Sequence, residues 1–248
     1  MPMIDINEVA VFIEEEIGPK FHFKRREKID ALTLDTIIKR KNPYLFKAKA
    51  NNSAADFVRS VLEATVSSGE ETAFGNFLEG FAIFVSEKSY GGRKSSAHGI
   101  DLEFEAEDIK YLVSIKSGPN WGNSSQLRQL VANFNTAKKI LHTSGGAARQ
   151  NIICVEGCCY GRDDKPDKGA HLKLCGQRFW EMISGGNESL YGDIIIPLGH
   201  AAKSHNEEIT ESITRKFNAL TGEFINRFCH PSGEIDWERL IKFNSGKK

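Results

Sequence analysis

Several features of membrane and secreted proteins are missing from this chain of 248 residues. The chain has no run of about 18 apolar residues, so a membrane span is not expected. The first 20 residues, MPMIDINEVAVFIEEEIGPK, are acidic and lack the basic start and long apolar stretch of a signal peptide. We therefore expect a cytoplasmic protein.

Cysteine is scarce and irregularly spaced. Of the five cysteines, Cys154, Cys158 and Cys159 lie in the apolar run NIICVEGCCYG, and Cys175 and Cys229 stand alone. This spacing is not that of paired zinc-binding knuckles, and the odd number does not suit a disulfide framework. The sequence predicts buried free thiols and disfavours a zinc site.

Net charge is also absent, because 33 Lys and Arg residues balance 33 Asp and Glu residues. The distribution is uneven, however. Residues 17–49 contain ten Lys or Arg and three Asp or Glu, a local balance of +7, and residues 70–110 contain four against nine, a balance of −5. These segments suit an anion-binding surface beside a cation-binding site, and they equally suit two solvated faces whose charges cancel.

The chain does contain regular helical and strand patterns. Helical apolar spacing occurs in INEVAVFIEEEI, IDALTLDTIIKR and AADFVRSVLEATVSS. We expect a break at KNPYLF, because the residue before Pro43 disfavours the helical region. EETAFGNFLEGFAIFVSE carries a broad apolar stripe that predicts a further helix.

Strands are predicted in the middle of the chain. DLEFEAE alternates strictly and YLVSIK follows after a short turn, which predicts an antiparallel hairpin. SSQLRQLVANFNTAKKIL predicts a helix capped by Ser124 or Ser125, and QNIICVEGCCYG predicts a buried strand. We then expect a polar loop (GRDDKPDKG), a short FWEMI helix, a DIIIPLG strand, and helices over roughly 203–228 and 235–243. This order predicts an α/β or α+β fold: one mixed sheet with a right-handed crossover and flanking helices.

The predicted hairpin carries residues that suit metal-dependent chemistry. Period-two geometry puts Leu112, Ser114 and Lys116 on one strand face, and Asp101 begins the neighbouring strand. Metal-dependent phosphodiesterases use such a carboxylate to hold Mg²⁺, which activates water and neutralises charge on phosphorus, while a lysine orients the nucleophile or the phosphate. Without further context, the same pattern also fits a surface ion pair.

A family resemblance sharpens this interpretation. GIDLEF…YLVSIKSG, preceded by the helix ETAFGNFLEGF, resembles the core of the PD-(D/E)XK nuclease superfamily. KNPYLF, TAFGNFLE, SIKSG, QLRQLVANFN, CCYG, FWEMI and DWERLIKF are similar, in this order across most of residues 41–243, to PmeII-type type II restriction endonucleases. The resemblance implies a restriction-endonuclease-like core and Mg²⁺-dependent hydrolysis of a short palindromic site in double-stranded DNA, leaving 5′-phosphates.

The resemblance also implies an organisation of the chain. A helical region over residues 1–66 would contact DNA or form a homodimer, and residues 67–248 would hold the catalytic core with the C-terminal helices, together as one compact unit. Homodimers are expected of such enzymes, because a two-fold symmetric protein matches a palindromic site.

The residues of the site follow from the same resemblance. Asp101 corresponds to the metal-binding aspartate, Lys116 to the catalytic lysine, and the backbone carbonyl of Ile115 to a further ligand. Ser114 departs from the pattern, since Glu or Asp generally stands two residues before the lysine. A serine hydroxyl is a poor Mg²⁺ ligand, so another acid replaces it or the site is inactive. Glu79, on the TAFGNFLE helix, is the favoured replacement.

Other roles stay open at this point. Glu103 shares the strand face of Asp101 and is the alternative acid, although Glu103, Glu105 and Glu107 also fit one solvated face, and Glu79 fits a solvated helix acid. The expected DNA contacts come from a loop that ends at a helix N-terminus, a loop beyond a strand end and a basic N-terminal segment. They are Asn120, Trp121, Asn123, Ser124 and Gln126; Arg162 and Lys165; and Lys24, Arg25 and Arg26.

Two rival functions share the predicted fold. One is a nuclease for repair or recombination that recognises DNA structure rather than sequence. The other is a noncatalytic DNA-binding module in which Ser114 has abolished metal binding.

Overall fold

A computed structural model describes residues 4–50, 52–143 and 151–247. The chain divides into two compact units. The first consists of Met1–Ile17 and Gly75–Ala201, and the second of Gly18–Phe74 and Ala202–Lys248. This division differs from the expected boundary at residue 66, which lies inside one continuous 37-residue helix, α5 (Ala54–Tyr90). The C-terminal helices also belong mainly to the second unit, not to the unit that holds the sheet.

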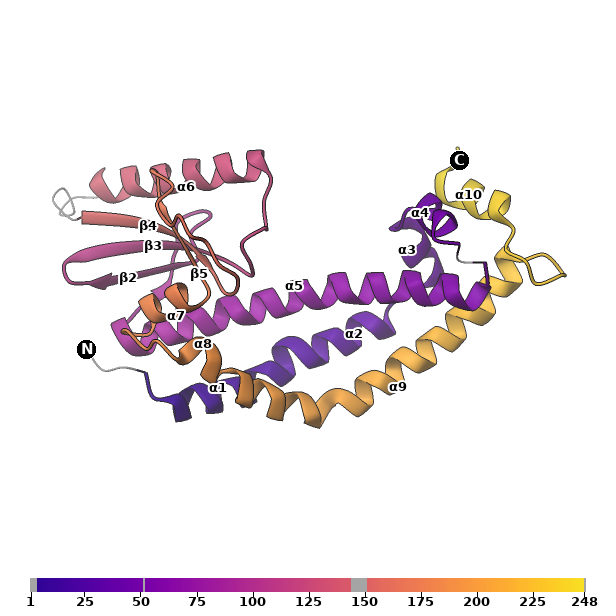
Figure 1. The fold of residues 1–248 in the computed structure, drawn as a ribbon, viewed down its shortest axis with the longest axis horizontal. Helices are drawn as coiled ribbons and strands as arrows, with labels where there is room; N and C mark the ends of the chain where they lie inside the picture. The colour runs from indigo at the N-terminus through magenta and orange to yellow at the C-terminus, as the bar shows by residue number, and fades with distance from the viewer. Residues whose placement is uncertain (1–3, 51, 144–150, 248) are drawn as a thin grey trace. The chain divides into compact units, whose positions relative to one another are not determined.

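A mixed sheet organises the first unit (Figure 1). Among the described residues it has five strands in the order β1-β2-β3-β4-β5, with antiparallel pairing from β1 to β3 and parallel pairing from β3 to β5. The predicted fold class is therefore confirmed. β1 and β5 were not predicted, because two and four residues are too few for a readable alternation. The strands are β1 (Arg93–Lys94), β2 (Leu102–Ala106), β3 (Ile109–Lys116), β4 (Asn151–Cys158) and β5 (Leu172–Cys175).

The predicted hairpin forms between β2 and β3. Leu102 pairs with Val113, and Ala106 pairs with Ile109 at the turn. The two turn residues, Glu107 and Asp108, have φ angles of 51° and 61°, the left-handed geometry that a tight two-residue hairpin connection requires. This register places the residue before β2, Asp101, beside the end of β3.

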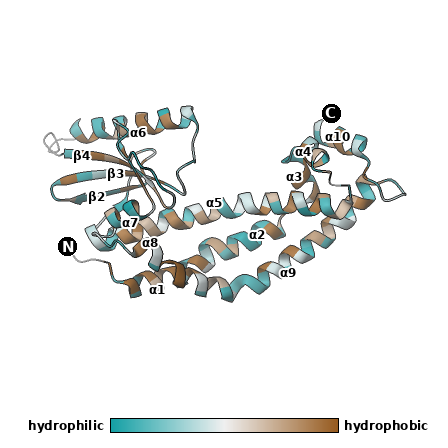
Figure 2. Cartoon of the chain, viewed as in Figure 1, coloured by the Kyte–Doolittle hydropathy of each residue, from teal (hydrophilic) through white to brown (hydrophobic). Residues whose placement is uncertain are grey.

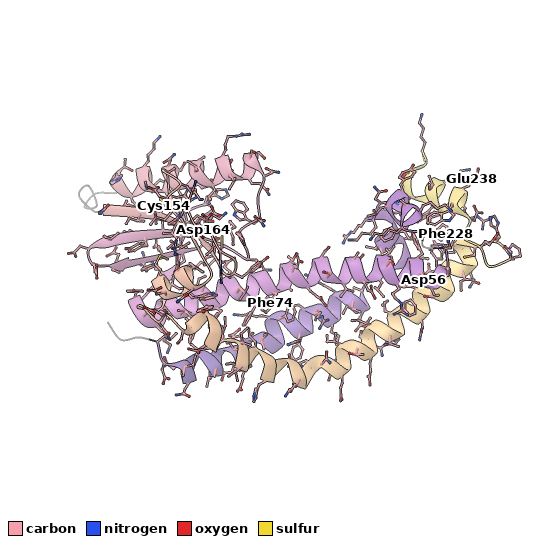
Figure 3. All side chains as sticks on the ribbon, in the orientation of Figure 1. Asp56, Phe74, Cys154, Asp164, Phe228 and Glu238 are labelled. Carbon is pink, nitrogen blue, oxygen red and sulfur yellow. The ribbon has the colours of Figure 1, made fainter. Side chains whose placement is uncertain are left out.

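Helices cover both faces of the sheet. α6 (Ser124–Thr143) packs in one hydrophobic cluster with Leu112 of β3 and Cys154 of β4, which is labelled in Figure 3. On the opposite face, the backbone of Gly157 lies against the ring of Phe179 in α7 (Gln177–Ile183). Figure 2 shows hydrophilic and hydrophobic residues alternating along α6, as expected for a helix with one buried side. Ser114 and Lys116 share a strand face with Leu112, as predicted, and this face is the one that α6 covers.

The second unit is helical. Phe57 of α5 stacks on Phe224 of α9, with ring centroids 4.8 Å apart, and Phe224 contacts Phe228, labelled in Figure 3. The predicted break before Pro43 occurs, because Asn42 is extended and its side chain accepts a hydrogen bond from the Tyr44 N–H. The remaining helices of the chain are α1 (Ile6–Ile17), the π-helix η1 (Gly18–Phe23), α2 (Lys24–Asp30), α3 (Leu34–Lys39), α4 (Pro43–Ala48), α8 (Leu190–Asp193), α9 (Ile195–Phe228) and α10 (Trp237–Ser245).

The predicted DIIIPLG strand is wrong. These residues form the end of α8 and the start of α9. Ile195 and Ile196 are 64% and 70% exposed, so the apolar run is not a buried strand. Pro197 lies in the first turn of α9, where its missing N–H is tolerated.

Two expectations from composition can be compared with the structure. The cysteines are free thiols, and four of them are buried, while Cys229 is partly exposed. Across the described ranges of the chain, no helix has the length and hydrophobicity that a membrane crossing requires.

Candidate active site

The candidate active site lies where β2 begins and β3 ends. The backbone N–H of Asp101 donates to the Val113 carbonyl at 2.9 Å, which continues the hairpin by one residue. Oδ2 of Asp101 accepts hydrogen bonds from the Ile115 N–H at 2.6 Å and from the Ser114 hydroxyl at 3.2 Å. Lys116 Nζ donates to Ser114 Oγ at 2.9 Å and lies 3.9 Å from Asp101 Oδ2. The structure thus brings together Asp101, Ser114, Ile115 and Lys116.

Solvent reaches the charged groups of this cluster. The side chains of Asp101 and Lys116 are 24% and 22% exposed, whereas Ser114 is 1% exposed. Ser114 therefore acts as a buried bridge that donates to the carboxylate and accepts from the ammonium. An acid at this position would add a negative charge that the serine does not supply.

The carbonyl of Ile115 faces the same side of β3 as Asp101. The N–H and C=O groups of one strand residue point in the same direction, and the Ile115 N–H points to Asp101. The next carbonyl, that of Lys116, faces β4 instead and accepts from the Cys159 N–H at 2.9 Å.

Glu79 lies on the part of α5 that faces the ends of β3 and β4. It stands four residues after Gly75, on the same side of the helix, and a Cβ on Gly75 would lie 3.8 Å from Ser117 Cβ. Burial raises the pKa of the Cys159 thiol to about 12, and the nearby charge of Glu79 adds to this shift. The Glu79 carboxylate pairs with Lys94 at 3.3 Å.

Lys94 links Glu79 to the strand that Asp101 precedes. Lys94 pairs in β1 with Leu102, the residue after Asp101. Glu103, the alternative acid, lies 2.7 Å from Arg93 and 3.9 Å from Lys110, so flanking basic side chains compensate its charge. Glu79 is the better candidate for a second metal ligand.

The donor set fits a hard divalent cation. Carboxylate and carbonyl oxygens suit Mg²⁺, which is commonly held by one or two carboxylates together with water and substrate phosphate. The nearby thiols of Cys158 and Cys159 are poor competitors, because burial raises both pKa values. Within the described part of the chain, no group of three or more His, Cys, Asp or Glu side chains could hold a metal.

The loop after Lys116 ends in a capped helix. Oδ1 of Asn123 accepts from the N–H groups of Ser125 and Gln126, and Oε1 of Gln126 accepts from the Asn123 N–H at 2.9 Å. Asn123 caps α6, so the predicted cap at Ser124 or Ser125 was wrong by one or two residues. Asn123 is the cap because Gln126 Oε1 accepts a hydrogen bond from the Asn123 N–H in return, which satisfies a further backbone donor. Asn120 in this loop and Ser124, the first residue of α6, are exposed.

The other expected DNA contacts lie elsewhere in the chain. Arg162 and Lys165 are exposed in the loop between β4 and β5, near Asp164, which Figure 3 labels. In the same loop Asp163 accepts from the Lys165 N–H and pairs with Lys168 at 3.0 Å.

The basic segment of α2 belongs to the second unit. Arg25 pairs with Glu70, Arg26 pairs with Glu208 at 2.6 Å, and Lys24 is exposed.

A buried carboxylate on the α6 face was not predicted. Glu156 of β4 is the register partner of Ser114 and is 1% exposed. Its Oε1 accepts from Trp121 Nε1 at 2.8 Å and lies 2.9 Å from Lys173 Nζ, and its Oε2 lies 3.1 Å from His171 Nε2. The available signal was a single acid inside the apolar run NIICVEGCCYG, which requires a buried partner.

Glu156 is ionised despite its burial. Burial alone would raise its pKa, but hydrogen bonds from His171, Trp121 and Lys173 outweigh that effect and lower the pKa to about 2. The carboxylate is therefore a compensated charge inside the protein.

Comparison with known families gives one match. The model of the family described as type II restriction endonuclease EcoO109I matches residues 7–206, a range that includes Glu79, Asp101, Lys116 and Glu156. No curated protein matches the chain. The resemblance to PmeII-type enzymes and to the PD-(D/E)XK superfamily stays a prediction. Because the EcoO109I family model matches most of the chain, the chain belongs to the EcoO109I family of type II restriction endonucleases.

Proposed function

We propose that this protein is a Mg²⁺-dependent, site-specific endonuclease of the PD-(D/E)XK type. It hydrolyses phosphodiester bonds within a short palindromic sequence of double-stranded DNA and leaves 5′-phosphates. It works in the cytoplasm as the nuclease of a restriction-modification system. Family membership supports a nuclease acting on DNA, and the residues at the ends of β2 and β3 support the finer claims.

The observation that carries the proposal is the placement of Lys116. Its ammonium lies 3.9 Å from Asp101 Oδ2 and 2.9 Å from Ser114 Oγ, at the end of β3, where solvent reaches it. An ammonium at this position can contact an oxygen of the scissile phosphate or of the attacking water. Its charge would stabilise the negative charge that develops there in the transition state.

The metal would be held by Asp101, Glu79 and the Ile115 carbonyl. When bound, Mg²⁺ supplies Lewis-acid stabilisation of the phosphate and a lower pKa for the attacking water. Ser114 keeps Asp101 and Lys116 in place through its two hydrogen bonds. Glu79, which pairs with Lys94 at 3.3 Å, would supply the second carboxylate for the cation.

DNA binding would use exposed polar and basic groups. Asn120 lies on the loop that follows Lys116, Ser124 begins α6 at the end of that loop, and Arg162 and Lys165 lie in the loop after β4. Lys24 and its neighbours in α2 would add attraction to phosphates that does not depend on sequence. A homodimer would present two such sites to the two strands of a palindrome.

The test is incubation of the purified protein with plasmid DNA and Mg²⁺, followed by sequencing of the fragment ends. The proposal predicts discrete fragments with one shared terminal sequence and 5′-phosphates, and no cleavage with EDTA or by Lys116→Ala. Intact plasmid under every divalent ion tried, together with a gel shift, would select the noncatalytic DNA-binding module.

The noncatalytic module is a serious second candidate, because Ser114 stands where the resemblance leads us to expect an acid. A structure-specific nuclease is separated by the same assay, since it would leave the plasmid uncut and nick branched or damaged DNA.

A further inference from the structure

Lys116 is in contact with an aromatic ring as well as with the candidate site. Its Nζ lies 4.9 Å from the centroid of the Trp121 ring, within the range of a cation–π interaction. The indole N–H of Trp121 donates in the opposite direction, to Oε1 of Glu156 at 2.8 Å. The contacts therefore run from the buried carboxylate through the indole to the ammonium.

The loop that carries Trp121 is fixed along its length. Lys173 Nζ donates to the Pro119 carbonyl at 2.8 Å and also pairs with Glu156. At the start of the loop, the Tyr160 N–H donates to the Ser117 carbonyl at 3.2 Å. Gly118 lies so close to the Tyr160 ring that a Cβ there would be 2.2 Å from the ring. The loop has little freedom to move Trp121 away from Lys116.

Glu156 is engaged in a way that does not suit a metal ligand. Oε1 accepts from Trp121 and Lys173, and Oε2 lies next to His171. The partner side chains are also largely buried, with Lys173 12% and His171 7% exposed. A buried ion pair is costly in desolvation, and removing one partner leaves an uncompensated buried charge.

We propose that Trp121 and Glu156 are positioning residues for Lys116. Glu156 holds the indole in one orientation, and the face of the indole confines the flexible lysine so that its ammonium stays beside Asp101 and Ser114. This inference rests on the proposed function, since it assigns a role in the catalytic step. It differs from the expectation that Trp121 contacts DNA.

The kinetic test measures single-turnover cleavage in Mg²⁺ with enzyme in excess over DNA, and DNA affinity in Ca²⁺. Trp121→Leu removes both the ring and the N–H, so we expect the cleavage rate constant to fall about 5- to 30-fold, the range of a cation–π contact. DNA affinity should stay within about twofold of wild type, because the ring acts on the lysine. Trp121→Phe keeps a ring, so its cleavage rate constant should lie between those of wild type and Trp121→Leu.

Trp237 offers a matched control. Lys47 Nζ lies 4.9 Å from its ring centroid, the same kind of contact in the second unit. Trp237→Leu should leave the cleavage rate of the folded protein unchanged. Equal losses for the Trp121 and Trp237 variants would overturn the proposal, and so would a wild-type rate for Trp121→Leu.

A readout without cleavage uses the indole N–H signals of the three tryptophans in ¹⁵N-labelled protein. Lys116→Ala should shift the Trp121 signal and leave those of Trp180 and Trp237 in place. Glu156→Leu combined with Lys173→Met, which removes the buried pair without leaving a lone charge, should expose the Trp121 N–H to solvent exchange. An unchanged Trp121 signal in both variants would contradict the proposal. If the wild-type protein proves not to cleave DNA, the nuclease proposal fails while these spectra still test the contacts.

Discussion

Two carboxylates on one sheet, Asp101 and Glu156, show how differently an acid can be used. The Asp101 side chain is 24% exposed and accepts hydrogen bonds on Oδ2, with an ammonium 3.9 Å away. Glu156 is 1% exposed and receives donors on both oxygens. A cation can approach the first carboxylate, whereas the second is already compensated.

The comparison teaches which acids are available for metal binding. The sequence suggested that another acid replaces the one missing at Ser114, and Glu156 is the register partner of Ser114. Glu156 is nevertheless buried, and both of its oxygens already have hydrogen-bond or ion-pair partners, which argues against a role in metal binding. Glu79, whose carboxylate pairs with the exposed Lys94, is easier to release to a cation.

The largest effect should come from Asp101. Asp101→Asn removes a charged ligand but keeps its size, so we expect the single-turnover rate constant of DNA cleavage to fall by about 10³-fold or more. Glu156→Gln, which still accepts from the Trp121 N–H, should lose no more than about tenfold. The rate constants of both variants are measured in Mg²⁺, and DNA binding in Ca²⁺ serves as the control. The contrast between the two carboxylates is refuted if Glu156→Gln is the more damaging change.

The next effect distinguishes Glu79 from Glu103. Glu79→Gln should raise the Mg²⁺ concentration for half-maximal cleavage at least tenfold, because a charged ligand is lost. Glu103→Gln should change it by less than about twofold, since Glu103 is paired with Arg93 and Lys110. The measurement is a Mg²⁺ titration of the cleavage rate. A larger shift for Glu103→Gln would transfer the metal role to the strand acid.

The charge of Glu156 should make the free energy of unfolding depend on pH in the acidic range. Its folded pKa of about 2 lies below the ordinary value of 4.5, so its stabilising contribution is complete above pH 4.5 and disappears as the pH falls towards 2. The contribution is on the order of 3 kcal/mol. Urea unfolding should therefore show Glu156→Gln less stable than wild type at pH 6, with a difference that shrinks towards pH 2. A constant difference would mean that the charge of Glu156 is not stabilising.

The smallest effect concerns the basic segment of α2. Replacing Lys24, Arg25 and Arg26 by Gln should make the negative slope of log binding constant against log salt concentration less steep, by up to about 0.9 per lost phosphate contact. Lys24 should account for most of the change, because Arg25 and Arg26 form ion pairs with Glu70 and Glu208. Lys88→Gln, which removes an ion pair with Glu8, is the control. An unchanged slope would place α2 away from DNA.

Local patterns predicted the elements around the site well. Strict alternation predicted the β2–β3 hairpin, and its register follows from the short turn at Glu107 and Asp108. The contact between Asp101 and Lys116 could therefore be anticipated. An apolar run is less informative, and the DIIIPLG segment forms helix because burial and period are not readable from three isoleucines.

Long-range partners could not be predicted. Glu156 meets Lys173 and His171 through β5, a four-residue strand whose position in the sheet no local pattern reveals. The two segments joined in α5 were expected as separate helices, because each shows its own apolar stripe. The division into two units, with α5 and α9 contributing residues to both, likewise depends on packing between distant segments.

The most direct test of the account is a crystal of the protein soaked in Mn²⁺, with anomalous scattering used to find the ion. We predict a peak about 2.0–2.6 Å from oxygens of both Asp101 and Glu79, next to the Ile115 carbonyl, and none at Glu156. A peak bound to Glu156, or an ion that leaves Asp101 without a contact, would contradict the account.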